Sequence, residues 1–420
     1  MQEILFLAHR VPWPPDRGDK IRSHHILNKL KTLAPVHVGA FADDVRDMGF
    51  AEAERAGLAS LHSEIRSKPQ WLAGVEALAT GKPVSLTSFS SRAMQAYVDA
   101  RLATGRISHI FVFSGQMAQY VPHDFTGRLV MDFVDVDSAK FESYAGEGDG
   151  FMRWINGREG QKLAAFEAQV AARADASLFV SEAEAALFRA RSGAGNVSAL
   201  GNGIDTDFYD PTASFKKLHP AYADPLIVFT GQMDYRPNIE AVSDFAHNAL
   251  SAIRATHPET SFAIVGRNPT EAVSALSALP GVQVTGAVED VRTWLAGADV
   301  VVAPLRIARG IQNKVLEAMA MAKPVVASTA AAEGIEAVDG AHFIVACDVA
   351  EEAKAVIDLL SDPARRLALG QAARAHVVAE YGWAKQLAAL DSILQPNFRH
   401  SREGGNSSPA VDALTRSRHD

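Results

Sequence analysis

The chain contains almost no cysteine: Cys347 is the only one in 420 residues. One thiol cannot form a disulfide within the chain, and a chain without disulfides suits a reducing compartment. The charge balance argues against a further class of protein, because a net charge of −8 gives no broad electrostatic attraction to nucleic acid. A local basic patch can still contact anionic lipid. We therefore expect a cytoplasmic protein that does not bind nucleic acid.

The start of the chain lacks a long hydrophobic run, and a common cofactor motif is missing. The apolar run from Ile4 to Ala8 follows no basic region and is too short for a signal peptide or a membrane span, so we expect a first strand there. No G-x-G-x-x-G follows it, which disfavours an NAD oxidoreductase. His9, His24 and His25 lack the spacing of metal ligands, and no metal site is predicted.

Short apolar runs alternate with helical patterns along nearly the whole chain. This alternation predicts two doubly wound α/β domains with parallel sheets. We expect strands at residues 4–8, 36–41, 107–113, 129–133, 176–180 and 197–200, and then at 226–230, 262–265, 282–285, 300–303, 325–327 and 343–346. The loop 201–224 is the expected linker, and the cleft between the halves is the expected ligand site. Residues 396–420 are polar and turn-rich, which indicates a disordered tail without a catalytic role.

The most informative stretch is residues 299–328, where a helix is expected between two buried strands. Gly310 is expected to open this helix, so that the free N–H groups of residues 310–312 can bind an anion. Lys314 and Glu317 are three residues apart and share a helix face. If a diphosphate sits at the helix start, Lys314 can add positive charge and Glu317 can accept hydrogen bonds from a sugar's hydroxyl groups. The alternative is an exposed ion pair on an ordinary crossover helix.

This stretch resembles the signature of the family-four retaining glycosyltransferases. Their pattern has a Glu, seven intervening residues, a second Glu, then Ala-x-Ala and Pro-Val-Val, and here Glu317, Ala318, Ala320 and 324–326 match it. The first Glu falls at Arg309, so half of the motif is present. Three blocks of sequence also resemble the sugar transferases found with bacterial exosortase and PEP-CTERM loci: HRVPWPPDRGDKIRS, MDFVDVDSAKFESYA and GIQNKVLEAMA.

The resemblance implies a GT-B fold with two Rossmann-like domains. Residues 1–204 would form the acceptor-side domain, 205–380 the nucleotide-sugar domain, and 381–395 a helix that crosses back to the first domain. The implied reaction moves a hexosyl unit, with retention of configuration, from a nucleoside-diphosphate sugar to a hydroxyl group. The implied acceptor is a lipid-linked saccharide at the inner face of the cytoplasmic membrane, during exopolysaccharide assembly and with only peripheral membrane contact. No cofactor is expected.

Two other functions remain open from the sequence. A nucleotide-sugar 2-epimerase shares the two-domain architecture, but it needs an acid and a base beside C2 of the sugar, and no such pair surrounds Glu317. A non-catalytic nucleotide-sugar-binding protein is the second alternative, because Arg309 and Gln232 replace expected donor-site groups. Turnover of the donor sugar would distinguish it from a transferase.

The resemblance also assigns the donor-binding residues. Relatives clamp the diphosphate with an Arg and a Lys where this chain has Gln232 and Asn238, so Arg236 or Arg309 is expected to supply the charge. The glycines after two strands permit close approach of the backbone to a ligand, or serve only as tight turns. The nucleobase would contact the backbone around Arg267 and Val288. The full set of expected donor residues is Gly231, Gln232, Arg236, Gly266, Arg267, Val288, Arg309, Gly310, Ile311 and Gln312.

Two features of the N-terminal half complete the expected site. The loop after the first strand would reach over the cleft, with Gly18 at a helix start that can bind phosphate. Its expected acceptor-side residues are His9, Arg17, Gly18 and Lys20, although Arg17, Lys20 and Arg22 are equally consistent with surface charge.

The second feature is a group of three carboxylates, Asp132, Asp135 and Asp137, at the end of the strand 129–133. An acid at a strand's carboxyl end can take the acceptor's proton if burial raises its pKa. Asp135 is the first choice and Asp132 the second. With Lys314 and Glu317, Asp135 completes the expected catalytic set. A calcium site is a rival, but the spacing lacks the glycine and the distal glutamate of an EF-hand loop. The other alternative is that these residues cap the following segment.

Overall fold

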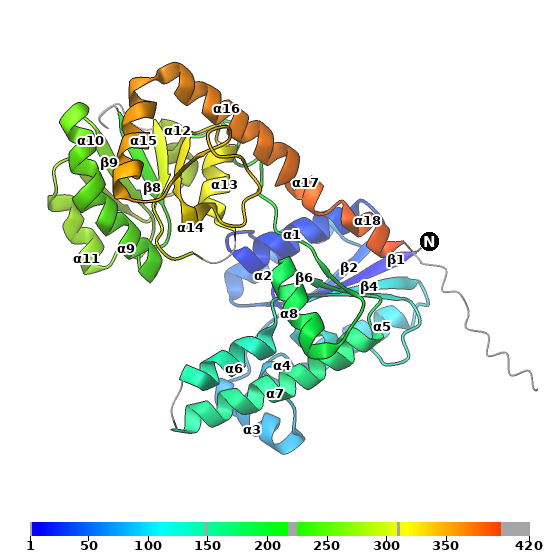
Figure 1. Ribbon diagram of the computed structural model, residues 1–420. Helices are drawn as coiled ribbons and strands as arrows, with labels where there is room; N and C mark the ends of the chain where they lie inside the picture. The colour runs from blue at the N-terminus through cyan, green and yellow to red at the C-terminus, as the bar shows by residue number, and fades with distance from the viewer. Residues whose placement is uncertain (1, 148–149, 217–224, 309–310, 396–420) are drawn as a thin grey trace, which may run out of the picture.

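The computed structural model describes residues 2–147, 150–216, 225–308 and 311–395. The predicted site residues Arg309 and Gly310 and the predicted tail 396–420 lie outside these ranges. Figure 1 shows two parallel sheets, each with helices against it. The expected doubly wound α/β class is therefore confirmed. Among the described residues, no helix is long and apolar enough to cross a membrane.

The first sheet has seven parallel strands in the order β3-β2-β1-β4-β5-β6-β7. Strand β1 is buried along its whole length, because helices cover both faces of the sheet. The edge strand β3 was not predicted from the sequence, since four of the six residues of SLHSEI are polar and the strand is only partly buried. The strands are β1 (Glu3–Ala8), β2 (Val36–Ala42), β3 (Ser60–Ile65), β4 (Ile107–Phe113), β5 (Arg128–Val134), β6 (Ala176–Phe179) and β7 (Val197–Ala199).

The helices of the first half fill the connections between these strands. They are α1 (Gly18–Lys31), α2 (Val45–Ala53), α3 (Gln70–Thr80), α4 (Val84–Ser88), α5 (Arg92–Leu102), α6 (Asp137–Glu147), α7 (Gly150–Arg173) and α8 (Glu182–Ser192). Ser181 caps the start of α8, because its hydroxyl oxygen accepts a hydrogen bond from the Glu184 N–H.

The second sheet has six parallel strands in the order β10-β9-β8-β11-β12-β13. They are β8 (Leu226–Thr230), β9 (Ser261–Val265), β10 (Val282–Gly286), β11 (Val300–Ala303), β12 (Val325–Ser328) and β13 (Ile344–Ala346). The helices are α9 (Arg236–Asp244), α10 (Leu250–Thr256), α11 (Glu271–Ala275), α12 (Val291–Gly297), α13 (Asn313–Ala320), α14 (Thr329–Ala332), α15 (Val349–Ser361) and α16 (Pro363–Glu380). The chain order reverses between β8 and β11, which is where open α/β sheets bind ligands.

Helix α13 begins three residues later than expected. Gln312, with an extended backbone, is the residue before the helix, and Val315 N–H donates the first hydrogen bond within it to Gln312 O at 3.0 Å. The N–H groups free to meet an anion are therefore those of Asn313 and Lys314, and the predicted start at Gly310 is wrong.

The chain passes twice between the two sheets, and the two passages lie side by side. Ile204 N–H donates to Tyr381 O at 2.7 Å. Gly203 has no room for a side chain, because a Cβ atom there would lie 2.7 Å from the Trp383 Cα. After this point α17 (Trp383–Gln386) and α18 (Ala389–Leu394) lie along the first sheet, as Figure 1 shows. Leu390 of α18 is fully buried there, in the same core cluster as β1 and β2.

A buried ion pair joins the first sheet to the linker. Arg22 is 1% exposed and Asp132 is fully buried, and Arg22 Nε lies 2.9 Å from an Asp132 carboxylate oxygen. The same guanidinium donates to Asn202 Oδ1 at 3.0 Å. Arg22 is thus a structural residue of the interior, and the alternative of surface charge is wrong for it.

Removal of this guanidinium should destabilise the protein strongly. Arg22→Met leaves the Asp132 carboxylate buried without its partner, which should lower the free energy of unfolding by about 3–5 kcal/mol in urea titrations. Arg46→Met is the control, because the Arg46 side chain is 87% exposed beside Asp44 and its removal should change stability by less than about 0.5 kcal/mol. Equal losses in the two variants would contradict the structural role of Arg22.

Candidate functional site

A cavity of about 1130 Å³ lies between the two sheets. Three parts of the chain line it: the loop and helix after β1, the linker, and the carboxyl-end loops of the second sheet. Its lining includes Pro15, Asp16, Ile21, His25, Gly203, Ile204, Asp205, Phe208, Tyr209, Val288, Asp290, Arg292, Asn313 and Glu317. The cavity therefore occupies the cleft in which a ligand was expected.

Lys314 lies beside this cavity, with its ammonium group held by uncharged partners. Nζ donates to Asn238 Oδ1 at 2.6 Å and lies 4.3 Å from the centre of the Phe229 ring. Burial lowers the pKa of Lys314 to about 8, although the nearby Glu317 carboxylate acts to raise it. The alternative of an exposed ion pair on an ordinary helix is therefore wrong. Lys314 is a half-buried cation at the carboxyl end of β8.

Glu317 lines the cavity one helical turn further along. Burial raises the pKa of its carboxyl group, while a hydrogen bond from the Tyr209 hydroxyl and the charge of Lys314 act in the opposite direction. Tyr209 belongs to the linker, and burial followed by the charge of Glu317 raises its own pKa. Sequence reasoning missed Tyr209 and the contact between Asn238 and Lys314. The only feature of the sequence that could have indicated Tyr209 is an aromatic residue in the linker beside the expected cleft.

Two predicted glycines make room for this arrangement. A Cβ atom on Gly266 would lie 1.6 Å from Gly231 O, so the backbones after β8 and β9 touch at this point. A Cβ atom on Gly231 would lie 2.8 Å from Asn238 Nδ2 and 3.1 Å from Lys314 Nζ. Internal packing at the ends of the strands therefore requires both glycines.

A smaller cavity of about 370 Å³ brings four of the ten predicted donor residues together with Lys314 and Glu317. It is lined by Thr230, Gly231, Val265, Gly266, Arg267, Ala287, Val288, Val291, Lys314 and Glu317. Gln232 is tied to its rim, because Arg267 Nη2 donates to Gln232 Oε1 at 3.2 Å. Val288, Val291 and Glu317 also line the larger cavity, so the two spaces adjoin.

The other predicted donor residues that the structure describes do not line the smaller cavity. Arg236 is 85% exposed and its Nε lies 2.7 Å from Glu240, and it lines neither cavity, so the expectation that it supplies charge to the site is not supported. Ile311 is 41% exposed, and Gln312 is half-buried. Among the described residues, Lys314 and Arg267 are thus the two cations that line the smaller cavity.

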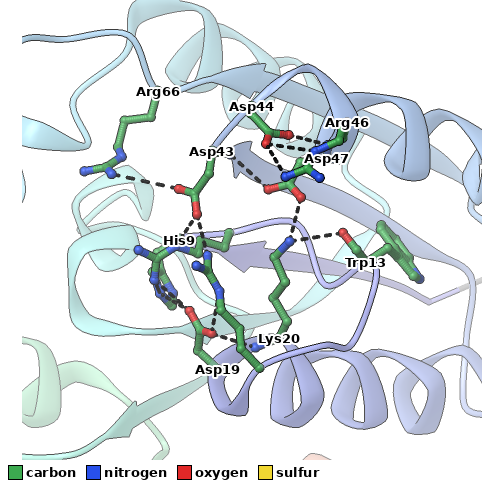
Figure 2. Close-up of polar contacts among 11 residues, drawn as sticks. His9, Trp13, Asp19, Lys20, Asp43, Asp44, Arg46, Asp47 and Arg66 are labelled. Carbon is green, nitrogen blue, oxygen red and sulfur yellow. Dashed lines mark hydrogen bonds and ion pairs between the residues drawn. The ribbon is translucent and has the colours of Figure 1, made fainter. Parts of the chain in front are cut away.

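The predicted N-terminal loop forms a network of charged side chains, shown in Figure 2. The Asp19 carboxylate accepts a hydrogen bond from Arg10 at 2.7 Å and from the backbone N–H of Lys20 at 3.0 Å, and it lies 3.3 Å from His9 Nε2. A carboxylate of the protein therefore already takes one N–H group in the first turn of α1. Phosphate binding at Gly18 therefore stays a prediction, with one N–H group of this helix start already bonded to Asp19.

The other predicted residues of this loop also interact with partners within the protein. Lys20 is 3% exposed, and its ammonium group lies 2.7 Å from Asp47, so it cannot face a ligand as predicted (Figure 2). Arg17 pairs with Asp43 and, at 3.2 Å, with Asp19. Burial lowers the pKa of His9, although its hydrogen bond with Asp19 acts to raise it.

The three predicted acids at the end of β5 differ in how deeply they are buried. Asp135 is exposed, which contradicts the burial expected of a proton acceptor. Asp132 is fully buried against Arg22, and burial raises its pKa despite the Arg22 charge. Burial also raises the pKa of Asp137. None of the three is among the residues that line the two cavities.

Comparison with known proteins supports the interpretation of the second half of the chain. Residues 224–362 match the family model described as "Glycosyl transferases group 1". A stretch of 218 residues is 29% identical to the GDP-mannose-dependent monoacylated alpha-(1-6)-phosphatidylinositol monomannoside mannosyltransferase of Corynebacterium glutamicum, covering 48% of this chain and 56% of the relative. A stretch of 244 residues is 29% identical to the phosphatidyl-myo-inositol mannosyltransferase of Propionibacterium freudenreichii, covering 56% of this chain and 60% of the relative. The chain thus matches little more than half the length of each relative.

A solved structure resembles the whole molecule. Anabaena Alr3699/HepE in complex with UDP superimposes with a TM-score of 0.60 at 16% identity, over 94% of this chain and 99% of that one. The same protein in complex with UDP-glucose gives a TM-score of 0.59. The GT-B fold expected from the sequence is confirmed. The chain therefore has the GT-B fold, and its residues 224–362 are similar to the group 1 glycosyl transferases.

The lowered pKa of Lys314 makes a prediction about stability. Between about pH 8 and pH 10.5 the folded protein has lost the Lys314 proton while the unfolded chain keeps it, so stability rises with pH across this window. In Lys314→Met this contribution is absent. Urea titrations at pH 7.5 and pH 10 should therefore show the wild type gaining stability relative to Lys314→Met. A constant difference between the two proteins would contradict the half-buried position of the ammonium group.

Proposed function

We propose that the protein is a retaining glycosyltransferase that moves a hexosyl unit from a nucleoside-diphosphate sugar to a hydroxyl group. The observation that carries the proposal is the placement of Lys314 and Glu317 on one helix at the cavity between the two sheets. They stand where the chain order of the second sheet reverses. The match of residues 224–362 to a glycosyltransferase family covers the same helix.

In this proposal the chain binds the leaving diphosphate electrostatically. The N–H groups of Asn313 and Lys314 and the Lys314 ammonium group stabilise the charge that develops on the diphosphate. No metal or other cofactor takes part. The Glu317 carboxylate accepts hydrogen bonds from vicinal hydroxyl groups of the nucleotide, and the Tyr209 hydroxyl fixes its orientation.

The proposed acceptor is a lipid-linked saccharide at the inner face of the cytoplasmic membrane. Both curated relatives are named as mannosyltransferases of phosphatidylinositol compounds, which are lipids. The sequence blocks shared with PEP-CTERM-associated transferases add exopolysaccharide assembly as the process. Asp135 is not proposed again as the proton acceptor, because it is exposed and does not line the cavity.

A panel of nucleotide sugars tests the donor class. UDP-, GDP-, ADP- and TDP-sugars would be compared by thermal shift, because a ligand at a hundred times its Kd stabilises the folded protein by about 2.7 kcal/mol. The donor that binds would then be supplied with a membrane lipid extract, and the release of nucleoside diphosphate would be measured. Conversion of the donor into its 2-epimer would contradict the proposal, and so would binding without turnover.

Loss of the Glu317 carboxylate should impair transfer without unfolding the protein. Glu317→Ala removes a charge-assisted hydrogen-bond pair worth about 1.5–3 kcal/mol, so kcat/KM for the donor should fall tenfold or more. Glu240→Ala is the control, since it removes a carboxylate that pairs with exposed Arg236 outside both cavities. Unchanged kinetics in Glu317→Ala would end its assignment to the nucleotide.

A further inference from the structure

Helix α3 has an inverted distribution of side chains. Its inward face buries only two small residues, Ala73 and Ala77. Its large apolar residues face solvent: Trp71 is 71% exposed, Leu72 41%, Val75 57% and Leu78 59%. Positions 71, 75 and 78 recur at one-turn spacing and form one stripe. A surface helix of a soluble protein normally places such residues inward, so this outward face is available to a partner.

A second exposed apolar group lies on helix α7 close to α3. Met152 and Trp154 are each 53% exposed. One turn beyond Trp154, on the same side of α7, Arg158 Nη2 donates to Ala77 O of α3 at 2.8 Å and to Lys82 O at 3.1 Å. Figure 1 shows α3, α6 and α7 together on the side of the first sheet that faces away from the second domain. The apolar patch consists of Trp71, Leu72, Val75, Leu78, Met152 and Trp154.

The charges around the apolar patch are opposite in sign to those of the whole chain. Residues 66–88 and 150–162 each contain three basic residues and one acidic residue, whereas the chain carries a net charge of −8. The two acidic residues are occupied: Glu76 pairs with Lys68 at 2.8 Å, and Glu159 accepts from the N–H groups of Val84 and Ser85 at the start of α4.

Exposed cations are left at the edge of the patch. Lys82 directly follows α3, and Lys162 lies two turns after Trp154 on the same side of α7. Both side chains are exposed. Two tryptophans and aliphatic residues bordered by lysines match the composition of segments that lie in the interface of an anionic bilayer.

We propose that the apolar patch docks the protein on an anionic lipid surface, with α3 lying in the plane of the interface. Trp71, Val75 and Leu78 enter the boundary between headgroups and acyl chains, and Lys82 and Lys162 meet the lipid phosphates. The inference deepens the proposed use of a lipid-linked acceptor, and it assigns the membrane contact to one surface of the N-terminal half. It does not depend on catalysis, because the patch lies on other residues than those that line the two cavities.

Flotation of the full chain with lipid vesicles tests the proposal. The wild type should bind vesicles of phosphatidylcholine with phosphatidylglycerol, and binding should weaken with salt or with phosphatidylcholine alone. The double variant Trp71→Ala, Leu78→Ala should lower the partition coefficient about tenfold or more. Leu367→Ala is the control, since Leu367 is 62% exposed on α16. Lys82→Gln with Lys162→Gln should reduce binding only to the anionic vesicles.

Two results would overturn the proposal. One is equal vesicle binding by the wild type and the Trp71→Ala, Leu78→Ala variant, or no binding by either. The other is a wild-type dimer in light scattering that becomes a monomer in this variant, which would assign the patch to a second copy of the chain. Calorimetric binding of the nucleotide sugar should be the same in both proteins. A failure of the proposed transferase activity would instead appear as absent turnover with vesicle binding intact.

Discussion

The contact between the Lys314 ammonium group and the Asn238 amide oxygen organises the end of the second sheet. A cation at this position has lost part of its hydration, and one short hydrogen bond at 2.6 Å and the Phe229 ring replace it. Because both partners are uncharged, the nearby Glu317 carboxylate is the group that acts on this positive charge, and a ligand in the cavity can interact with it as well. The glycines at 231 and 266 follow from this arrangement, since a Cβ atom at either position would collide with the groups that hold Lys314 or with the neighbouring loop.

The linker takes part in the site as well as joining the two halves. Tyr209 contributes the hydroxyl group that bonds Glu317, and a few residues earlier Ile204 pairs with Tyr381 on the returning chain. Arg22 bonds Asn202 at the start of the same linker and Asp132 within the first sheet. Residues of the linker therefore contact the interior of the N-terminal half, the returning segment and the surroundings of the carboxylate in the cavity.

Much of the fold could be predicted from the sequence. Buried parallel strands are short apolar runs such as Val300–Ala303, and such runs can be recognised without knowing which segments pack beside them. The shared helix face of Lys314 and Glu317 could also be predicted, since the spacing along a helix fixes which residues share a face. The partners of charged residues could not be predicted from the sequence. Lys20 with Asp47, Arg236 with Glu240 and Arg22 with Asp132 depend on which segments meet in the folded chain.

Burial was equally hard to predict at the ends of strands. Asp132 and Asp135 are three residues apart in one acidic run, yet one is fully buried and the other is exposed. The strand β5 continues to Val134, so Asp132 is covered within the sheet and Asp135 lies beyond its end. The outward apolar face of α3 could not be predicted, because an apolar stripe on a helix normally faces the core and here it faces solvent.

We propose that Lys314 and the start of α13 bind the donor diphosphate without a metal ion. Calorimetric titration with UDP-glucose and GDP-mannose in excess EDTA tests it most directly. We expect one of these nucleotide sugars to bind the wild type with the same Kd in EDTA and in Mg²⁺ or Mn²⁺, and Lys314→Met to weaken this binding about tenfold or more. Binding that appears only when Mg²⁺ or Mn²⁺ is restored, or that is unchanged in Lys314→Met, would contradict it.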